Sequence, residues 1–124
     1  MSIEQRIEEF AIEDKNFIYY DLSDFKTNDE FVEYTKIAKE RITKYANYSL
    51  LTITNVKDVK FDSETKNIIA DWMKYNKPYV KFGTVIGFDG IKKIMVNAVL
   101  KLCGRKNMAF ISSKEQAIEL LLKQ

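Results

Sequence analysis

Residues 77–106 have the sequence KPYVKFGTVIGFDGIKKIMVNAVLKLCGRK. The β-branched and aromatic residues at positions 79–86 predict a strand, and the turn Gly87-Phe88-Asp89-Gly90 follows it. A helix is expected from Ile91 to Cys103, with Gly104 in the left-handed position beyond its end. The spacing of its apolar residues predicts a buried face made of Ile91, Ile94, Met95, Ala98, Val99 and Leu102. A strand that leads into a helix in this way is half of an α/β crossover unit.

The same alternation continues along the rest of the chain. Further strands are expected at 17–20, 50–56 and 108–111. Helices are expected at 28–45, around Ile68 to Met73 with an end before Pro78, and at 113–122, with Asn28 capping the first of these helices. A strand at 9–13 is expected to pair with 17–20 through a polar turn, although residues 2–10 also fit the start of a helix. We therefore predict one α/β domain, residues 1–124, with a mixed, mostly parallel sheet of four to five strands flanked by four helices.

Composition excludes several kinds of chemistry. The chain has no histidine and one cysteine, Cys103, so histidine-activated nucleophiles and the usual zinc sites are excluded, and no disulfide can form within the chain. We expect no metal, no cofactor and no enzymatic activity. Cys103 itself is interpreted as an inert, half-buried thiol. Asp21, Asp24 and Asp58 are interpreted as solvated loop acids rather than ligands of magnesium.

The start of the chain lacks the apolar core of a signal peptide, and no apolar run is long enough to span a bilayer. We therefore expect a cytoplasmic protein. The net charge is +2, but residues 1–30 hold nine acids and three bases, whereas residues 91–124 hold two acids and seven bases. Nucleic-acid binding is not expected, because no recognised motif for it is present.

The basic residues Lys92, Lys93, Lys101, Arg105 and Lys106 suit an acidic partner or a peripheral membrane contact, or else a solvated surface. A homodimer is a further expectation, because residues 7–13 are expected to form an edge strand.

The turn before the 91–103 helix is a candidate anion or ligand site. In parallel sheets, ligands usually bind at the carboxyl ends of the strands, and free N–H groups at a helix start attract anions. The candidate residues are Gly87, Phe88, Gly90, Lys92 and Lys93. The alternative is that both glycines only allow a tight turn and that Asp89 caps the helix.

Motifs along most of the chain resemble the STAS superfamily, in particular the branch similar to stage II sporulation protein AA. The motifs are Tyr20-Asp21-Leu22-Ser23, Thr54-Asn55-Val56 followed by Phe61-Asp62, Asn76-Lys77-Pro78-Tyr79-Val80-Lys81, Val85-Ile86-Gly87 with Gly90-Ile91-Lys92-Lys93-Ile94, and Phe110 with Ala117. The resemblance implies a mixed sheet flanked by helices and a role in regulation or binding.

The resemblance also implies a candidate phosphorylation switch at Ser63. In the sporulation antagonists, the phosphorylated serine follows an aspartate at the start of the second helix, usually in Asp-Ser-Ser-Gly. The pair Asp62-Ser63 matches, but Glu64 and Thr65 replace the Ser-Gly. The alternative is that Asp62 or Ser63 simply caps the helix.

The leading hypothesis is therefore a non-catalytic regulatory or protein-interaction module of STAS type. The alternative is a carrier of a lipid or anionic metabolite, because the STAS branch is loosely grouped with the lipid-transfer CRAL-TRIO domains. Such a carrier needs an apolar cavity, expected among Phe82, Ile86, Ile91 and Met95, with the anionic group at the 87–93 turn. An enzyme that uses carboxylate or lysine chemistry is the third hypothesis.

Overall fold

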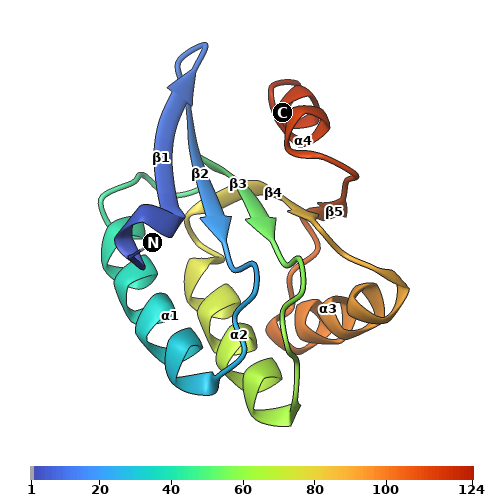
Figure 1. Ribbon diagram of the computed structural model, residues 1–124. Coiled ribbons are helices and arrows are strands. Elements are labelled where there is room, and N and C mark those ends of the chain that lie inside the picture. The colour runs from blue at the N-terminus through green and yellow to red at the C-terminus, as the bar shows by residue number, and fades with distance from the viewer. Residues whose placement is uncertain (1) are drawn as a thin grey trace.

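The computed structural model describes residues 2–124 and contains one five-stranded sheet, whose strands lie side by side in chain order (Figure 1). The elements are η1 (Glu4–Arg6), β1 (Ile7–Ile12), β2 (Lys15–Asp21), α1 (Asn28–Ile42), β3 (Leu50–Asn55), α2 (Ser63–Asn76), β4 (Val80–Ile86), α3 (Gly90–Cys103), β5 (Met108–Phe110) and α4 (Lys114–Leu121). The predicted α/β class, with a mixed, mostly parallel sheet and four α-helices, is confirmed.

A tight hairpin joins the first two strands. β1 and β2 are antiparallel, with Ile12 opposite Lys15, so only two residues form the loop. These residues, Glu13 and Asp14, have φ angles of 52° and 64°. Positive φ at both loop positions is the geometry of a type I′ turn, whose twist matches that of the two strands. The predicted pairing is confirmed, and within residues 2–6 helical structure is limited to the three residues of η1.

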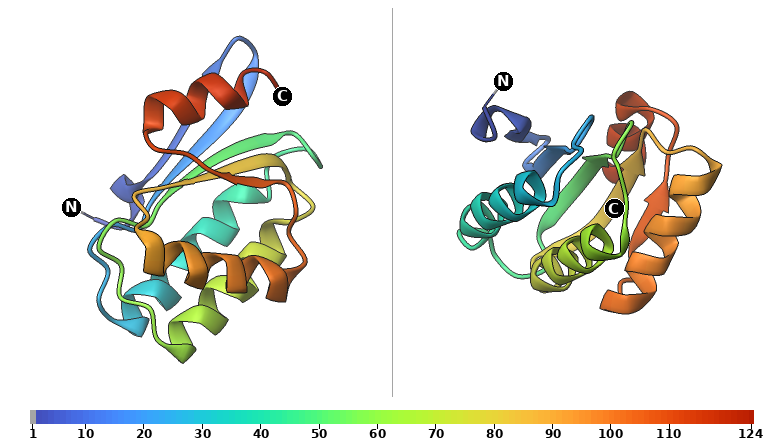
Figure 2. Two further views of the ribbon diagram at one scale, coloured as in Figure 1. Left: turned by 90° about the vertical axis from the view of Figure 1, so that its right-hand side faces the viewer. Right: turned by 60° about the horizontal axis from the view of Figure 1, so that its bottom comes forward.

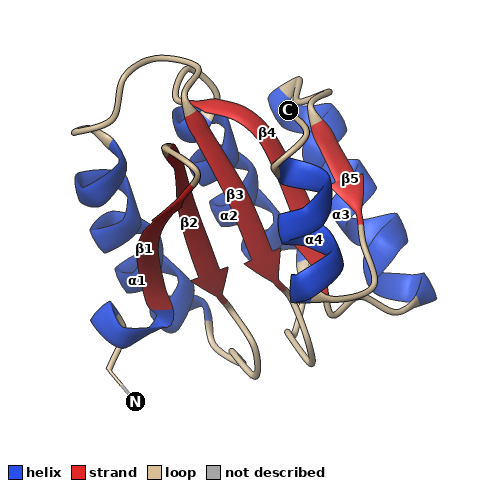
Figure 3. Cartoon of the chain, turned by 90° about the horizontal axis from the view of Figure 1, so that it is seen from above, coloured by secondary structure: helices blue, strands red, loops and turns tan. Residues whose placement is uncertain are grey.

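The other strands are parallel, and helices cover both faces of the sheet. β2, β3, β4 and β5 pair in parallel, in that order. The crossover helices α1, α2 and α3 form one layer on one face, and α4 lies on the opposite face (Figure 2). Figure 3 looks onto the α4 side, where α4 lies above the β3–β4 part of the sheet and leaves β1 and much of β2 uncovered.

Two apolar cores follow from this layering. The larger core lies between the sheet and α1–α3, and at its centre the ring of Trp72 packs edge-on against Tyr20 and Tyr34, at centroid distances of 4.8 and 6.0 Å. The smaller core lies under α4 and contains Phe17, Leu51, Ile53, Ile86, Ala117 and Leu121. In the part of the chain that the structure describes, no helix has the length and apolarity needed to cross a membrane.

Side-chain caps mark where each helix begins. Thr27 caps α1 in a capping box with Glu30, so the prediction that Asn28 caps this helix is wrong. Asn28 instead accepts a hydrogen bond from Thr65 Oγ1 (2.6 Å) and ties the starts of α1 and α2 together. Ser113 caps α4 as predicted. Thr27 and Ser113 thus accept hydrogen bonds from first-turn N–H groups that have no partner within the helix.

The strand order separates the charges of the chain. Most acidic residues of positions 1–30 lie in or beside β1 and β2, at one edge of the sheet, whereas residues 80–113 supply β4, α3 and β5 at the other edge. Residues 80–113 contain six basic residues and one acid, Asp89. Because β1 and β5 are the two outer strands, the uneven charge of the sequence becomes a charge difference between two edges of the molecule.

Candidate interaction surface

Helix α3 is held firmly at both ends, and this fixes which face it turns to the core. Asp89 caps its start by accepting a hydrogen bond from the Lys92 N–H (2.8 Å). Gly104 ends it with a φ of 69° and donates its N–H to carbonyl groups of the last turn. Between these ends, the side chains of Val96, Val99, Leu100 and Cys103 are buried. Since these four residues follow the i, i+3, i+4, i+7 pattern, they define the inner face of the helix.

The opposite side of α3 carries a second row of apolar side chains, which face solvent. Ile91 and Ile94 are each 72% exposed and Leu102 is 59% exposed, while Met95 and Ala98 are partly exposed. We call these five residues the α3 stripe. The predicted buried face of α3 is therefore wrong for the five residues of the stripe and right only for Val99. The helix has apolar residues at helical spacing on two sides, and the core of the protein covers the side that contains Val99.

The α3 stripe is unusual among the helices of this chain. Of the six large apolar side chains that are exposed in the described residues, three belong to α3, whereas α1 and α2 contribute one each, Val32 and Tyr75. The exposed positions of α1 and α2 are otherwise mainly charged or polar, as expected for a solvated face. A row of exposed aliphatic side chains on one helix is instead typical of an interaction surface.

Positive charge lies beside the α3 stripe. Lys93, Asn97 and Lys101 follow one another at i, i+4, i+8 and form a polar row along one flank of the stripe. Lys93 Nζ lies over the rings of Phe88 and Phe110, at 5.9 and 5.3 Å from their centroids. Lys101 is exposed and makes no ion pair within residues 2–124.

Asp89 occupies the candidate anion site at the start of α3. Its carboxylate accepts the Lys92 N–H and also pairs with Lys92 Nζ at 3.2 Å. These contacts, led by the backbone hydrogen bond from Lys92, hold the pKa of Asp89 below its ordinary value. The Asp89 carboxylate therefore lies where an external anion was expected to bind. Lys92 is already neutralised by Asp89.

The glycines of this turn have different structural roles. Gly87 has a φ of 75°, and a Cβ on it would collide with Asn55 Oδ1. Gly90 has neither constraint, since nothing lies within 4 Å of the position its Cβ would take. Phe88 packs edge-on against Phe110 at 5.1 Å. Gly87 therefore lets β4 and β3 end close together, and Phe88 anchors the turn to β5.

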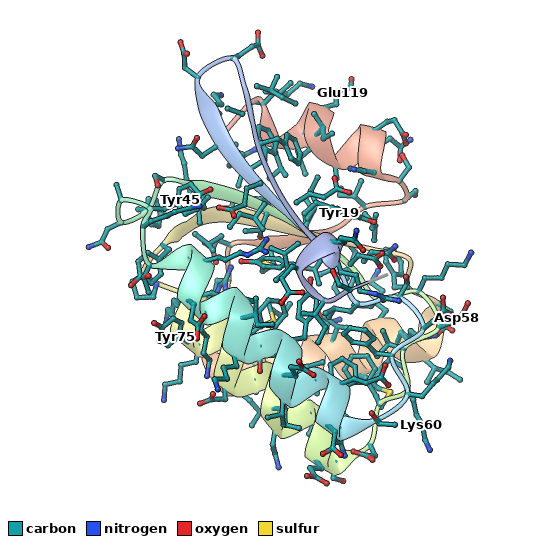
Figure 4. All side chains as sticks on the ribbon, turned by 60° about the vertical axis from the view of Figure 1, so that its left-hand side comes forward. Tyr19, Tyr45, Asp58, Lys60, Tyr75 and Glu119 are labelled. Atoms are coloured by element: carbon teal, nitrogen blue, oxygen red, sulfur yellow. The ribbon has the colours of Figure 1, made fainter. Side chains whose placement is uncertain are left out.

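The carboxyl ends of the strands, where a ligand was expected, are closed by the protein's own loops. The Leu22 N–H donates to the Asn55 carbonyl and the Val56 N–H to the Ile86 carbonyl, and Leu22 and Val56 are buried. Below them, the enclosed space within the larger core has a volume of only about 20 Å³. Figure 4 shows Asp58 and Lys60 on the loop after β3, at this end of the molecule, and Tyr45 and Tyr75 at the opposite end.

The four residues expected to line a carrier cavity are not brought together. Phe82 and Ile86 contact the smaller core under α4. Ile91 and Met95 lie on α3, which covers the other face of the sheet, and Ile91 is largely exposed. The sheet itself therefore separates the two pairs of residues.

Ser63 is the first residue of α2 and is exposed. The cap of α2 is Asp62, whose side chain accepts the Thr65 N–H at 2.8 Å, and this backbone hydrogen bond leads the contacts that lower the pKa of Asp62. Asn28 Nδ2 donates to Glu64 Oε2 at 3.0 Å. Ser63 is thus accessible, but it stands between two carboxylates, and a phosphate there would meet negative charge on both sides.

Arg105 and Cys103 are inside the molecule rather than on its basic surface. Arg105 is only 5% exposed, and its guanidinium donates to the Met73 carbonyl (3.2 Å) and to Asn107 Oδ1 (3.0 Å). Burial lowers the pKa of this guanidinium. Cys103 is buried, and its thiol donates to the Leu100 carbonyl. The expectation that Arg105 belongs to a surface patch was wrong, because it joins the end of α2 to the start of β5.

A large hollow lies elsewhere, between α1 and α2. This open groove has a volume of about 820 Å³ and is lined in part by Val32, Ile68 and Tyr75. An ion pair between Lys39 Nζ and Asp71 Oδ2 (2.6 Å) crosses it, and Lys39 Nζ also lies 5.3 Å from the centre of the Tyr75 ring. Lys39 and Asp71 thus neutralise each other within this groove.

No metal-binding cluster is present among residues 2–124, where no three acidic or cysteine side chains come close enough to hold an ion. Asp21 instead accepts the Ser23 N–H in its own loop (2.9 Å), and the Asp58 carbonyl accepts a hydrogen bond from Lys26 Nζ (2.6 Å).

The α3 stripe was not predicted to be a surface, although the sequence contains a signal for it. Nine of the 14 residues of α3 are apolar, and they form two rows, so one row had to remain outside unless another element covered it. No protein-family model matches this chain, and no curated protein matches it. Membership of the STAS superfamily accordingly remains a hypothesis that rests on the quoted motifs.

Proposed function

We propose that this chain is a non-catalytic regulatory or protein-interaction module, of STAS type, and that it binds an anionic partner protein through the α3 stripe. The observation that carries the proposal is the exposure of Ile91, Ile94 and Leu102 in one row. Leaving three large aliphatic side chains in water forgoes roughly 1.5–3 kcal/mol each relative to full burial. A partner that covers them recovers part of this free energy.

Charge decides what kind of partner suits this surface. No acidic residue occurs from Ile91 to Ser113, while Lys93, Lys101 and Lys106 are exposed there. A partner with negative charge around an apolar patch is therefore complementary, and one with positive charge is repelled. A second copy of this chain is a poor match, since symmetric pairing of two α3 stripes would bring like charges together.

Affinity capture with matched variants tests this function. Ile94→Asp places a charge in the centre of the stripe, and Val32→Asp does the same at an exposed valine on α1. Both sites are exposed, so both variants should fold with a stability close to that of the wild type. We expect the wild type and Val32→Asp to retain the same proteins from a lysate of the source cells and Ile94→Asp to lose them.

Two results would contradict the proposal. One is capture that is identical for all three proteins, because the stripe would then play no part in binding. The other is turnover of a small substrate by the purified chain in the absence of any captured protein, because that result would favour an enzyme.

A further inference from the structure

The α3 stripe has the geometry that accepts another helix. Ile91, Ile94, Met95 and Ala98 stand at i, i+3, i+4 and i+7, the four positions that frame a hole for one side chain of a facing helix. Ala98 is the smallest of the four, and its small side chain lets a large residue of the partner approach the α3 backbone. Leu102 stands four residues beyond Ala98 and continues the row, whereas Val99 belongs to the buried inner face. The stripe therefore offers one exposed hole, and Leu102 extends the apolar surface along the same line.

An extended peptide has less to bind here. Strand addition needs unpaired backbone N–H and C=O groups at a sheet edge, whereas the backbone groups of a helix are already paired within it. The inner face of α3 is buried against the core, so the helix cannot rotate to present another side. A helix that packs along the stripe at the usual interaxial distance of about 8–10 Å fits better.

The lysines make the two flanks of the stripe different. On one flank lies the polar row Lys93, Asn97 and Lys101. On the other, the stripe adjoins the inner face at Val99. Lys92 adds no free charge, because Asp89 neutralises it. Acidic residues on a bound helix are therefore favourable on the side that faces Lys93 and Lys101.

A membrane surface fits less well than a helix. Helices that lie on bilayers commonly carry aromatic residues at the interface, and the stripe has none. The neighbouring helices of the same layer also expose the acids Glu33, Glu40 and Glu64. A broad anionic bilayer would bring its charge near these acids, whereas a single partner helix avoids them.

From these observations we infer that α3 binds an amphipathic helix of another protein. The apolar residues of that helix are spaced at i, i+3, i+4 and i+7, and its acidic residues lie on the flank that faces Lys93 and Lys101. This inference rests on the proposed function and adds to it the secondary structure and the charge pattern of the partner.

Two designed peptides test the inference. Each is a capped amphipathic helix with the same leucine row, and one carries glutamates and the other lysines on a single flank. Fluorescence anisotropy measures the binding of each to the full chain. We expect the glutamate peptide to bind at least tenfold more tightly than the lysine peptide, and this preference to shrink as salt is added. Lys101→Glu should reduce or reverse the preference, and the matched Lys36→Glu on α1 should leave it unchanged.

Each further outcome separates the inference from the proposed function. Loss of all peptide binding in Ile94→Asp supports the inference. Equal binding of both peptides, or binding by neither, overturns it, and lysate capture that depends on Ile94 would still support the proposed function. Binding to vesicles of phosphatidylcholine and phosphatidylserine, without binding to the peptides, overturns it in favour of a membrane surface. A concentration-dependent dimer that Ile94→Asp abolishes overturns it in favour of a second copy.

Discussion

Two buried tyrosines of the larger core differ in one hydrogen bond. Tyr34 Oη donates to the carbonyl oxygen of Arg6 at 2.9 Å. Tyr20 Oη is buried and has no partner among residues 2–124. Burial raises the pKa of both phenols above the ordinary value, so both hydroxyls are neutral at physiological pH. A buried polar group without a partner carries a desolvation cost that no contact offsets.

Removing each hydroxyl should have opposite effects on stability. We expect Tyr20→Phe to raise the free energy of unfolding, or leave it unchanged, because an unpaired hydroxyl is removed while the ring keeps its contact with Trp72. Tyr34→Phe should lower it by about 1 kcal/mol, since the Arg6 carbonyl loses its donor. Urea denaturation of both variants measures the difference. A larger loss for Tyr20→Phe than for Tyr34→Phe would contradict this assignment.

Gly87 and Gly90 provide a second matched pair. Gly87→Ala introduces a side chain at positive φ and against Asn55, so the free energy of unfolding should fall by about 2 kcal/mol or more. Gly90→Ala adds a Cβ in open space within the first turn of α3, where alanine is a better helix former, so stability should be unchanged or slightly higher. Thermal and urea unfolding provide the comparison. An equal loss of unfolding free energy in the two variants would show that the positive φ and the contact with Asn55 do not require a glycine at position 87.

At the scale of single elements, the starts of α2 and α3 depend on carboxylates. Asp62 and Asp89 each accept backbone hydrogen bonds, and these bonds hold both pKa values below those of unfolded aspartates. A carboxylate whose pKa is lower in the folded state than in the unfolded state stabilises the fold at pH values above the unfolded pKa, which is about 3.9 for aspartate. This stabilisation is lost as the pH falls through the folded-state pKa. Both caps should therefore weaken in acid.

The acid dependence can be assigned with Asp89→Asn. Asparagine can cap the helix but does not titrate, so the variant should lose less stability than the wild type between about pH 5 and pH 2. Chemical denaturation at a series of pH values measures this. If the two curves of unfolding free energy against pH ran parallel, Asp89 would not contribute to the acid dependence.

The helices also show how far the sequence predicts this structure. Strand–helix alternation predicted the class, the sheet and nearly every element, because periods of 2 and 3.6 residues differ clearly over lengths such as these. The orientation of α3 could not be predicted in the same way. Val96, Val99, Leu100 and Cys103 repeat at the same spacing as the α3 stripe, and only the tertiary contacts show which row is covered.

The candidate site was predicted only in part, for a related reason. The sequence placed glycines and lysines at the start of α3, and the structure puts them there. The structure also shows two features that could not be predicted from the sequence. Asp89 occupies this helix start, and the buried Leu22 and Val56 fill the rim between the strand ends. Arg105 was misplaced because charge alone does not reveal that a side chain finds the Met73 carbonyl inside the fold.

At the scale of the whole molecule, charge and apolar exposure coincide at one edge. The consecutive strand order puts acidic β1 at one side of the sheet and basic β4, α3 and β5 at the other. In the proposed function, the long-range field of such a molecule would turn its α3 edge toward an anionic partner before contact, and the α3 stripe would then provide the apolar surface to be covered. The proposed function needs both properties in the same place.

The orientation of α3 is the claim on which this account depends most, and the single cysteine of the chain makes it measurable. Ile94→Cys places a second thiol on the stripe, while Cys103 serves as an internal control on the inner face. In a dilute native sample treated with a thiol reagent, we predict that position 94 is modified at the rate of an exposed thiol and that Cys103 reacts only after unfolding. Rapid modification of Cys103, with protection at position 94, would contradict the account.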